Sequence, residues 1–138
     1  MKFKKENSDI ITPTKAHKTD AGYDIYSPET FEVEAHSFSK RINLGVGFEI
    51  PIGYCGYVVE RSSQGAKGIN VIGPVVDVGY TGNVHATLVN NTDKTHFVNK
   101  GDRICQILLL AISMEELEEV NEFNLSDRGD KSHGSSGV

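Results

Sequence analysis

The sequence predicts an all-β protein, built as a sandwich, a jelly roll or a closed barrel. Two observations carry this prediction: short strand-like runs follow one another closely between turn residues, and helical periodicity is sparse. The chain has 138 residues, which fits one domain. Its apolar content of 38% is enough for one modest core, so disorder over the whole length is not expected.

Five segments are predicted as strands. Residues 31–35, 42–50 and 83–88 alternate between apolar and polar or glycine positions, as half-buried strands do. Residues 54–59 and 104–112 are mostly apolar runs of strand length, which predicts strands buried on both faces. Gly, Pro, Asn and Asp residues between these runs mark the turns.

Helical signal is confined to two places. Residues 61–67 are expected to form a turn or two of helix after the strand that ends at Glu60. Residues 114–120 have a helical composition, but Leu117 and Val120 alone make a thin apolar face. We therefore expect a short or irregular element there.

Charge and cysteine content limit the partners and the compartment. The net charge of −5 predicts no broad basic surface, so neither nucleic acid nor an anionic membrane is expected as a partner. No stretch approaches the ~18 apolar residues of a membrane span, which predicts a cytoplasmic protein, or one in host cytoplasm if a virus or phage encodes it. Cys55 and Cys105 are expected to be buried free thiols.

The end of the chain differs from the rest. Residues 126–138 are rich in Gly, Ser and charged residues and have no aliphatic residue before Val138. Such a segment cannot bury enough apolar surface to offset its ordering entropy. The expected organisation is a β-domain over residues 1–125 and a mobile arm over residues 126–138, unless a ligand or neighbouring subunit holds that arm.

Five short segments carry the chemistry, and each alone is a weak signal. Together, in order and across nearly the whole chain, they resemble the five motifs of the trimeric dUTP pyrophosphatase (dUTPase) family. The resemblance implies a dUTPase-type β-barrel or jelly roll with a flexible C-terminal tail. The five segments are Ala21 to Ile25, Arg61 to Gly68, Val75 to Asn83, Gly101 to Gln106 and Arg128 to Gly137.

The resemblance implies hydrolysis of dUTP to dUMP and pyrophosphate. In the family, magnesium assists the attack of water on the α-phosphate. The reaction keeps dUTP low and supplies dUMP for thymidylate synthesis. Family members are homotrimers whose active sites are shared: one subunit gives the first, second and fourth motifs, another the third, and the last the tail.

The second and fourth motifs imply phosphate contacts. Arg61, Ser62 and Ser63 offer a guanidinium, two hydroxyls and consecutive backbone N–H groups, which suit a phosphate cradle but also an ordinary helix start. Gln106 interrupts an apolar strand, either as a satisfied core amide or as a ligand contact. The family places the matching residues beside the phosphates, and it implies that Asp24 reaches Mg²⁺ through water.

The third motif implies the nucleoside pocket. By resemblance, the hairpin containing Ile72, Gly73 and Val76 binds the substrate, and Tyr80 packs under the deoxyribose so that a 2′-hydroxyl is excluded. Asp77 is the candidate general base, because attack by water needs a positioned acceptor. Its apolar neighbours are expected to desolvate it partly.

The fifth motif gives the arm a role. By resemblance, Arg128 clamps the γ-phosphate, and the residues that follow surround the nucleotide. His133 stands where most of the family has Phe, and its planar ring can still stack on uracil. The further substrate-binding residues of this segment are Gly134, Ser135 and Ser136.

The sequence departs from the family pattern at several positions. Pro74 occupies a place usually held by Gly and removes one backbone donor. Gly79 and Thr81 replace an acid and a base that commonly flank the tyrosine, and Ser132 replaces a glycine in the tail. By resemblance, these departures concern details of the hairpin and not the reaction.

Two other readings use the same residues. The dCTP deaminases share the fold, and Asp77 to Tyr80 fits their local pattern, but their catalytic Glu would fall at Thr87, which has no carboxylate. A non-catalytic trimer that binds a nucleotide or a protein partner is the second alternative. Catalysis is favoured by the joint presence of Asp24, Asp77, Gln106 and Arg128.

Overall fold

The computed structural model describes residues 1–124 and 126. Apart from one helical turn, all regular structure in this part of the chain is β-strand, which confirms the all-β prediction. The elements in chain order are β1 (Lys2–Lys5), β2 (Gly22–Tyr26), β3 (Phe31–Val33), β4 (Ser37–Phe38), β5 (Ile42–Asn43), β6 (Val46–Glu49), β7 (Tyr54–Val59), α1 (Ser62–Gly65), β8 (Ile69–Ile72), β9 (Val75–Val76), β10 (His85–Asn90), β11 (His96–Val98) and β12 (Arg103–Ala111).

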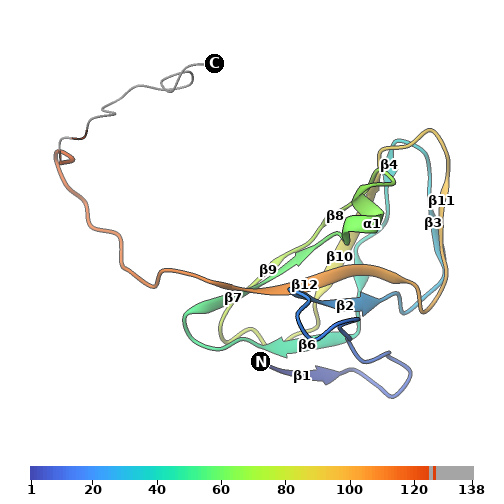
Figure 1. Cartoon of the computed structure of the whole chain (residues 1–138), viewed down its shortest axis with the longest axis horizontal. Helices are drawn as coiled ribbons and strands as arrows, with labels where there is room; N and C mark the ends of the chain where they lie inside the picture. The colour runs from blue at the N-terminus through green and yellow to red at the C-terminus, as the bar shows by residue number, and fades with distance from the viewer. Residues whose placement is uncertain (125, 127–138) are drawn as a thin grey trace.

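The strands pair antiparallel (Figure 1). One four-stranded sheet has the order β2-β12-β7-β9, and another joins β4, β10 and β5, with β8 also paired to β10. Two further pairs are β1-β6 and β3-β11. Among the described residues these ladders do not join into one closed barrel.

The sheet around β12 sets the position of the site. β12 is the longest strand and lies between β2 and β7. Its register places Gln106 opposite Asp24 on one side and opposite Val59 on the other. Residues that lie 82 positions apart, Asp24 and Gln106, are thereby neighbours on one sheet.

The core receives side chains from nearly every strand. Val84, Ala86 and Leu88 are buried to 2% exposure or less, which confirms that they share an inward face. Cys55 and Cys105 are buried and unpaired, as expected. Burial, with a smaller contribution from the Asp24 carboxylate, raises the pKa of the Cys105 thiol to about 12. Cys105 is therefore a packing residue and not a nucleophile.

Two strand predictions need correction. Residues 42–50 do not form one strand, because Gly45 adopts a φ of 66° and separates β5 from β6. β7 and β12 have the predicted bounds within one residue, but neither is buried on both faces in the single chain. Tyr57 is 41% exposed and Leu110 is 40% exposed. The outer face of this sheet is thus left partly uncovered.

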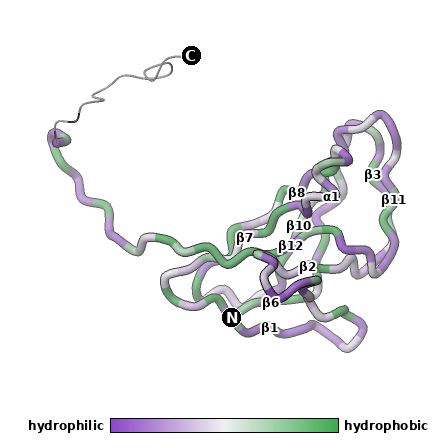
Figure 2. The backbone as a smooth tube through the Cα atoms, viewed as in Figure 1, coloured by the Kyte–Doolittle hydropathy of each residue, from purple (hydrophilic) through white to green (hydrophobic). Residues whose placement is uncertain are grey.

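Residues 114–120 form no helix. Leu117 is fully exposed, so the thin apolar face finds nothing to pack against. Glu115 and Glu119 would also repel each other at helical spacing. The segment after β12 runs away from the body, and its residues alternate between hydrophilic and hydrophobic (Figures 1 and 2).

Candidate functional site

A cavity of about 450 Å³ lies between the loop before β2, the segment after β7 and the middle of β12. It unites residues from three of the predicted motifs that are distant in sequence. The predicted site residues that line it are Asp24, Arg61, Ser62, Ser63 and Gln106. We call it the phosphate cavity.

Gln106 is fixed at the wall of this cavity by the strand register. Its Nε2 donates to the Glu60 carbonyl oxygen at 3.0 Å, where β7 has just ended. Gly22 faces the same amide, and a Cβ at Gly22 would lie 2.5 Å from Gln106 Oε1. Glycine at position 22 therefore leaves the room that the Gln106 side chain occupies. Within residues 1–124 and 126, only one of the amide's donors is used, so the amide can still contact a ligand.

Asp24 is the electrostatic centre of the cavity. Its carboxylate accepts from Arg61 Nε at 2.7 Å and from Arg103 Nη1 at 3.2 Å. The Asp24 side chain is only 13% exposed, so these pairs are shielded from water more than surface ion pairs are. Two guanidinium groups meet one carboxylate in this cluster, and Lys15 and Asp20 add one charge of each sign to the cavity lining.

Arg103 was not foreseen as part of this cluster. It lies within the fourth motif, but its contact with Asp24 depends on how β2 and β12 pair. The ladder shifts register between Arg103 and Cys105. A sequence pattern indicates the two strands and not this irregular alignment.

The second motif presents donors to the cavity. Ser62 and Ser63 open the single turn α1, and both are exposed. Arg61 precedes the turn without a capping side-chain bond, and its Nη1 donates to Ser63 Oγ at 3.4 Å. In the described part of the chain, the N–H groups of Ser62 and Ser63 make no backbone hydrogen bond outside the turn. Hydroxyl and N–H donors thus remain for an anion.

The donor set suits magnesium only as an ion that arrives with phosphate. No group of three or more His, Cys, Asp or Glu residues gathers as a metal site within residues 1–124 and 126. Asp24 and Asp20 are the two carboxylate residues that line the cavity; two arginines share the first, and the second accepts from His17 N. Mg²⁺ keeps several waters and takes one or two carboxylates with substrate phosphates, so one carboxylate acting through water is chemically adequate.

The turn after β9 carries the predicted nucleoside residues. Tyr80 N donates to the Asp77 carbonyl at 3.2 Å, and Gly79 between them has a φ of 85°. Tyr80 Oη donates to the Asn83 carbonyl at 2.9 Å. A Cβ at Gly82 would lie 2.5 Å from that hydroxyl oxygen, so glycine lets the ring fold back over the turn.

A small cavity of about 180 Å³ beside this turn is lined by Val76, Asp77 and Tyr80, among others. Gly73 lies just before it, packed so tightly that a Cβ would be 2.3 Å from the Val58 carbonyl oxygen. Ile72 is 66% exposed. The turn therefore brings together three of the five substrate-binding residues predicted for this hairpin.

Asp77 is exposed, contrary to the expectation of partial desolvation. Its neighbours do not cover it, because Val76 turns into the core while Val75 and Val78 are 54% and 40% exposed. Residues adjacent in sequence alternate across a strand, so apolar neighbours need not lie over the carboxylate.

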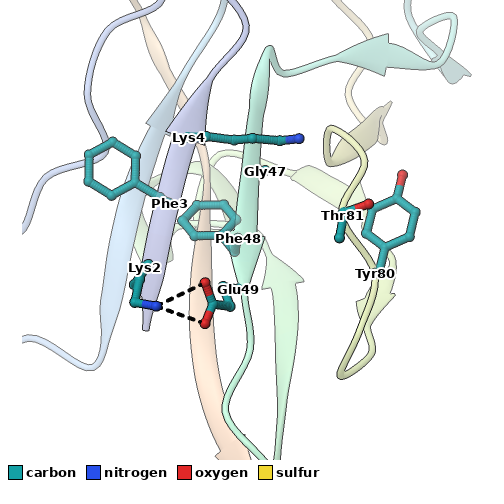
Figure 3. Close-up of a pocket in the computed structure, with 8 residues that line it drawn as sticks. All are labelled: Lys2, Phe3, Lys4, Gly47, Phe48, Glu49, Tyr80 and Thr81. Carbon is teal, nitrogen blue, oxygen red and sulfur yellow. Dashed lines mark hydrogen bonds and ion pairs between the residues drawn. The ribbon is translucent and has the colours of Figure 1, made fainter.

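The other side of the Tyr80 turn faces β1 and β6 across a cavity of about 270 Å³ (Figure 3). Lys2 Nζ donates to both carboxylate oxygens of Glu49, at 3.0 and 3.3 Å. A Cβ at Gly47 would lie 2.7 Å from the Gly82 carbonyl oxygen, so the turn packs closely on β6. The turn that contains Tyr80 thus packs against the β1-β6 strand pair.

The phosphate cavity and the cavity beside Asp77 share no lining residue. One chain therefore holds the predicted phosphate and nucleoside residues in separate places. The predicted site residues of the arm lie outside the described residues: Arg128, His133, Gly134, Ser135 and Ser136.

Where the structure describes the chain, no helix is long and apolar enough to cross a membrane.

The fold and the site define a class of protein: an all-β domain with a cavity of charged and hydroxyl groups suited to phosphate and a separate glycine-rich turn that carries an aspartate and a tyrosine. The family model described as dUTPase matches residues 8–137. The chain belongs to the dUTPase family.

Similar proteins come from viruses and phages. The chain is 36% identical over its whole length to a deoxyuridine 5'-triphosphate nucleotidohydrolase of rabbitpox virus, covering 93% of it, and 35% identical, with the same coverage, to that of variola virus. Among solved structures, a mutant dUTPase of Staphylococcus bacteriophage 80alpha with dUpNHpp has a TM-score of 0.90 and 32% identity, over 99% of this chain and 98% of that one. A mutant dUTPase of phage phi11 of S. aureus, described with a structural Mg(II) ion, has a TM-score of 0.81 and 28% identity, over 90% of this chain and 98% of that one.

Proposed function

We propose that this chain is a dUTP diphosphatase that converts dUTP and water to dUMP and pyrophosphate. The observation that carries the proposal is the phosphate cavity, in which three distant motifs of a chain of this family converge. The reaction would keep dUTP low and supply dUMP for thymidylate synthesis. We place it in the cytoplasm, or in host cytoplasm if a virus or phage encodes the chain.

The phosphate chain binds to the donors of the cavity. Ser62 and Ser63 donate from their hydroxyl and N–H groups, and the Arg61 guanidinium supplies charge that Asp24 keeps in place at 2.7 Å. Gln106 contributes the amide donor and acceptor that its hydrogen bond to the Glu60 carbonyl leaves free. Arg128, Gly134, Ser135 and Ser136 of the arm close over the γ-phosphate.

Asp77 acts as the general base. It accepts a proton from the water whose oxygen attacks the α-phosphorus, and pyrophosphate leaves. The exposed carboxylate gains its position and its shielding from water when the site closes around the nucleotide. Tyr80 packs under the deoxyribose, backbone groups of Ile72, Gly73 and Val76 read uracil, and His133 stacks on the base.

Magnesium, when bound, would screen the charge of the phosphates and hold the triphosphate in one conformation. Asp24 is the residue that would hold it, through water. Arg61 and Arg103 orient that carboxylate at the cavity wall.

The complete site forms in a homotrimer. The two cavities share no lining residue within one chain, which supports a site to which a second copy contributes its turn. Exposed apolar side chains are available to bury in that assembly: Ile72 is 66% exposed, Leu117 fully exposed and Phe123 92% exposed. The arm of a third copy completes the site.

A panel of nucleotides tests the function. Purified protein with Mg²⁺ is incubated with dUTP, UTP, dTTP and dCTP, and the products are separated by chromatography. We expect dUMP and pyrophosphate from dUTP and little from the others. Ammonia release from dCTP would identify a deaminase, and no turnover of any nucleotide would leave a binding protein.

A further inference from the structure

Lys15 is a cavity residue to which the proposed mechanism gives no role. It lies in the loop before β2 and lines the phosphate cavity. Its neighbour Thr14 exchanges two backbone hydrogen bonds with Asp24, at 3.1 and 2.7 Å. Lys15 is therefore fixed to the same strand that positions the central carboxylate.

The loop itself is closed by local hydrogen bonds. His17 N donates to Asp20 Oδ2 at 2.8 Å, and Asp20 N donates to the His17 carbonyl at 3.1 Å. Lys15 Nζ donates to the Asp20 carbonyl and stands 4.7 Å from the centre of the Tyr23 ring. These contacts hold the ammonium group in place before any ligand arrives.

The Lys15 ammonium retains donors and charge for a ligand. It carries three N–H groups, and one of them is used by the Asp20 carbonyl. Within the described residues it makes no ion pair, whereas Arg61 is paired with Asp24 at 2.7 Å. Asp20 also lines the cavity, but its carboxylate accepts from His17 N at 2.8 Å and forms no ion pair with Lys15 in the described part of the chain. Of the two cations that line the cavity, Lys15 is thus the one without an ion pair there.

We propose that Lys15 is a further phosphate-binding residue, whose ammonium group contacts the polyphosphate of the substrate opposite Arg61 and the two serines. For the identity of that substrate the inference rests on the proposed function. Lys15 is a binding residue, and proton transfer stays with Asp77. The inference accounts for a half-buried lysine held by a neutral carbonyl and a ring at the cavity wall.

The test is direct binding to the full-length protein with Mg²⁺. Calorimetry measures Kd for dUpNHpp and for inorganic pyrophosphate with wild type, K15Q, K15R and K18Q. We expect K15Q to weaken both about tenfold, the scale of one charge-assisted hydrogen bond that is partly exposed. K15R keeps the charge and should stay close to wild type. K18Q is the matched control, because Lys18 is in the same loop but is exposed and does not line the cavity.

Salt dependence separates charge from loop structure. If Lys15 binds phosphate by charge, the difference between wild type and K15Q shrinks as KCl is raised. A salt-independent loss would mean that the loop was disturbed, and this would overturn the proposal, as would unchanged binding in K15Q. If wild type binds pyrophosphate through Lys15 but does not hydrolyse dUTP, the proposed function fails and Lys15 stands. If the wild type hydrolyses dUTP normally but K15Q binds both ligands as the wild type does, the proposed function stands and the proposal for Lys15 fails.

Discussion

At the scale of single residues, the candidate site divides into groups that the fold fixes and groups that it leaves open. Asp24 and Gln106 are held by strand register and by hydrogen bonds to Arg61 and Glu60. Asp77 is exposed and has only the turn to hold it. The residues proposed to bind phosphate are therefore positioned within one chain, whereas Asp77, the proposed base, would depend on its surroundings in the proposed assembly.

Replacing Asp77 by Asn tests the general base. The side chain keeps its shape but loses the proton acceptor, so kcat for dUTP should fall by about 10²–10⁴. Binding of dUpNHpp should persist, because the phosphate contacts lie elsewhere. Single-turnover kinetics and calorimetry give both values. Near-normal turnover in this variant would remove Asp77 from the mechanism.

Replacing Tyr80 by Ala tests sugar selection. The ring folds back over Gly82 and is proposed to fill the space of a ribose 2′-hydroxyl. Without it, kcat/KM for UTP and dUTP should converge, whereas Tyr80→Phe should keep discrimination because it keeps the ring. The comparison requires both nucleotides under the same conditions. An unchanged ratio in the Ala variant would contradict this role.

At the scale of elements, the sequence predicted the strands that form the site better than their pairing. The predicted bounds of β7 and β12 were within one residue of the observed ones, because a long apolar run between turn residues has few other places to begin and end a strand. The break at Gly45 was not predicted, because the alternation of apolar and polar or glycine positions continues on both sides of this glycine with positive φ. The ion pair between Arg103 and Asp24 and the position of Lys15 at the cavity were also not predicted, because both depend on which strands become neighbours. The arm residues stay predictions.

Close backbone packing at Gly73 tests the element scale. A methyl group there would lie 2.3 Å from the Val58 carbonyl oxygen, so Gly73→Ala should destabilise the fold by about 1–3 kcal/mol. Gly65→Ala is the control, because its nearest neighbour would be 3.5 Å away and the residue is helical. Urea unfolding at one protein concentration compares them. Equal stability of the two variants would show that the hairpin moves away from β7 at little cost.

At the scale of the whole molecule, the proposed function requires more than one copy of the chain. Its phosphate cavity and the cavity beside the Tyr80 turn share no lining residue. Apolar side chains are exposed on the outer face of the β12 sheet and on the segment after it. Clusters of exposed apolar side chains commonly mark surfaces that bind a partner. The proposed trimer would account for both features, because one copy would then supply what another lacks and the exposed surface would be buried.

Complementation between two inactive variants measures this claim most directly. Arg61→Gln damages the phosphate cavity and Asp77→Asn removes the base. If the site joins residues of different copies, an equal mixture that exchanges subunits freely regains about a quarter of wild-type activity, because a quarter of the sites pair an intact cavity with an intact turn. Mass spectrometry verifies the mixed trimers. Activity that stays at the level of the parents in verified mixed trimers would mean that Arg61 and Asp77 of one chain serve the same site.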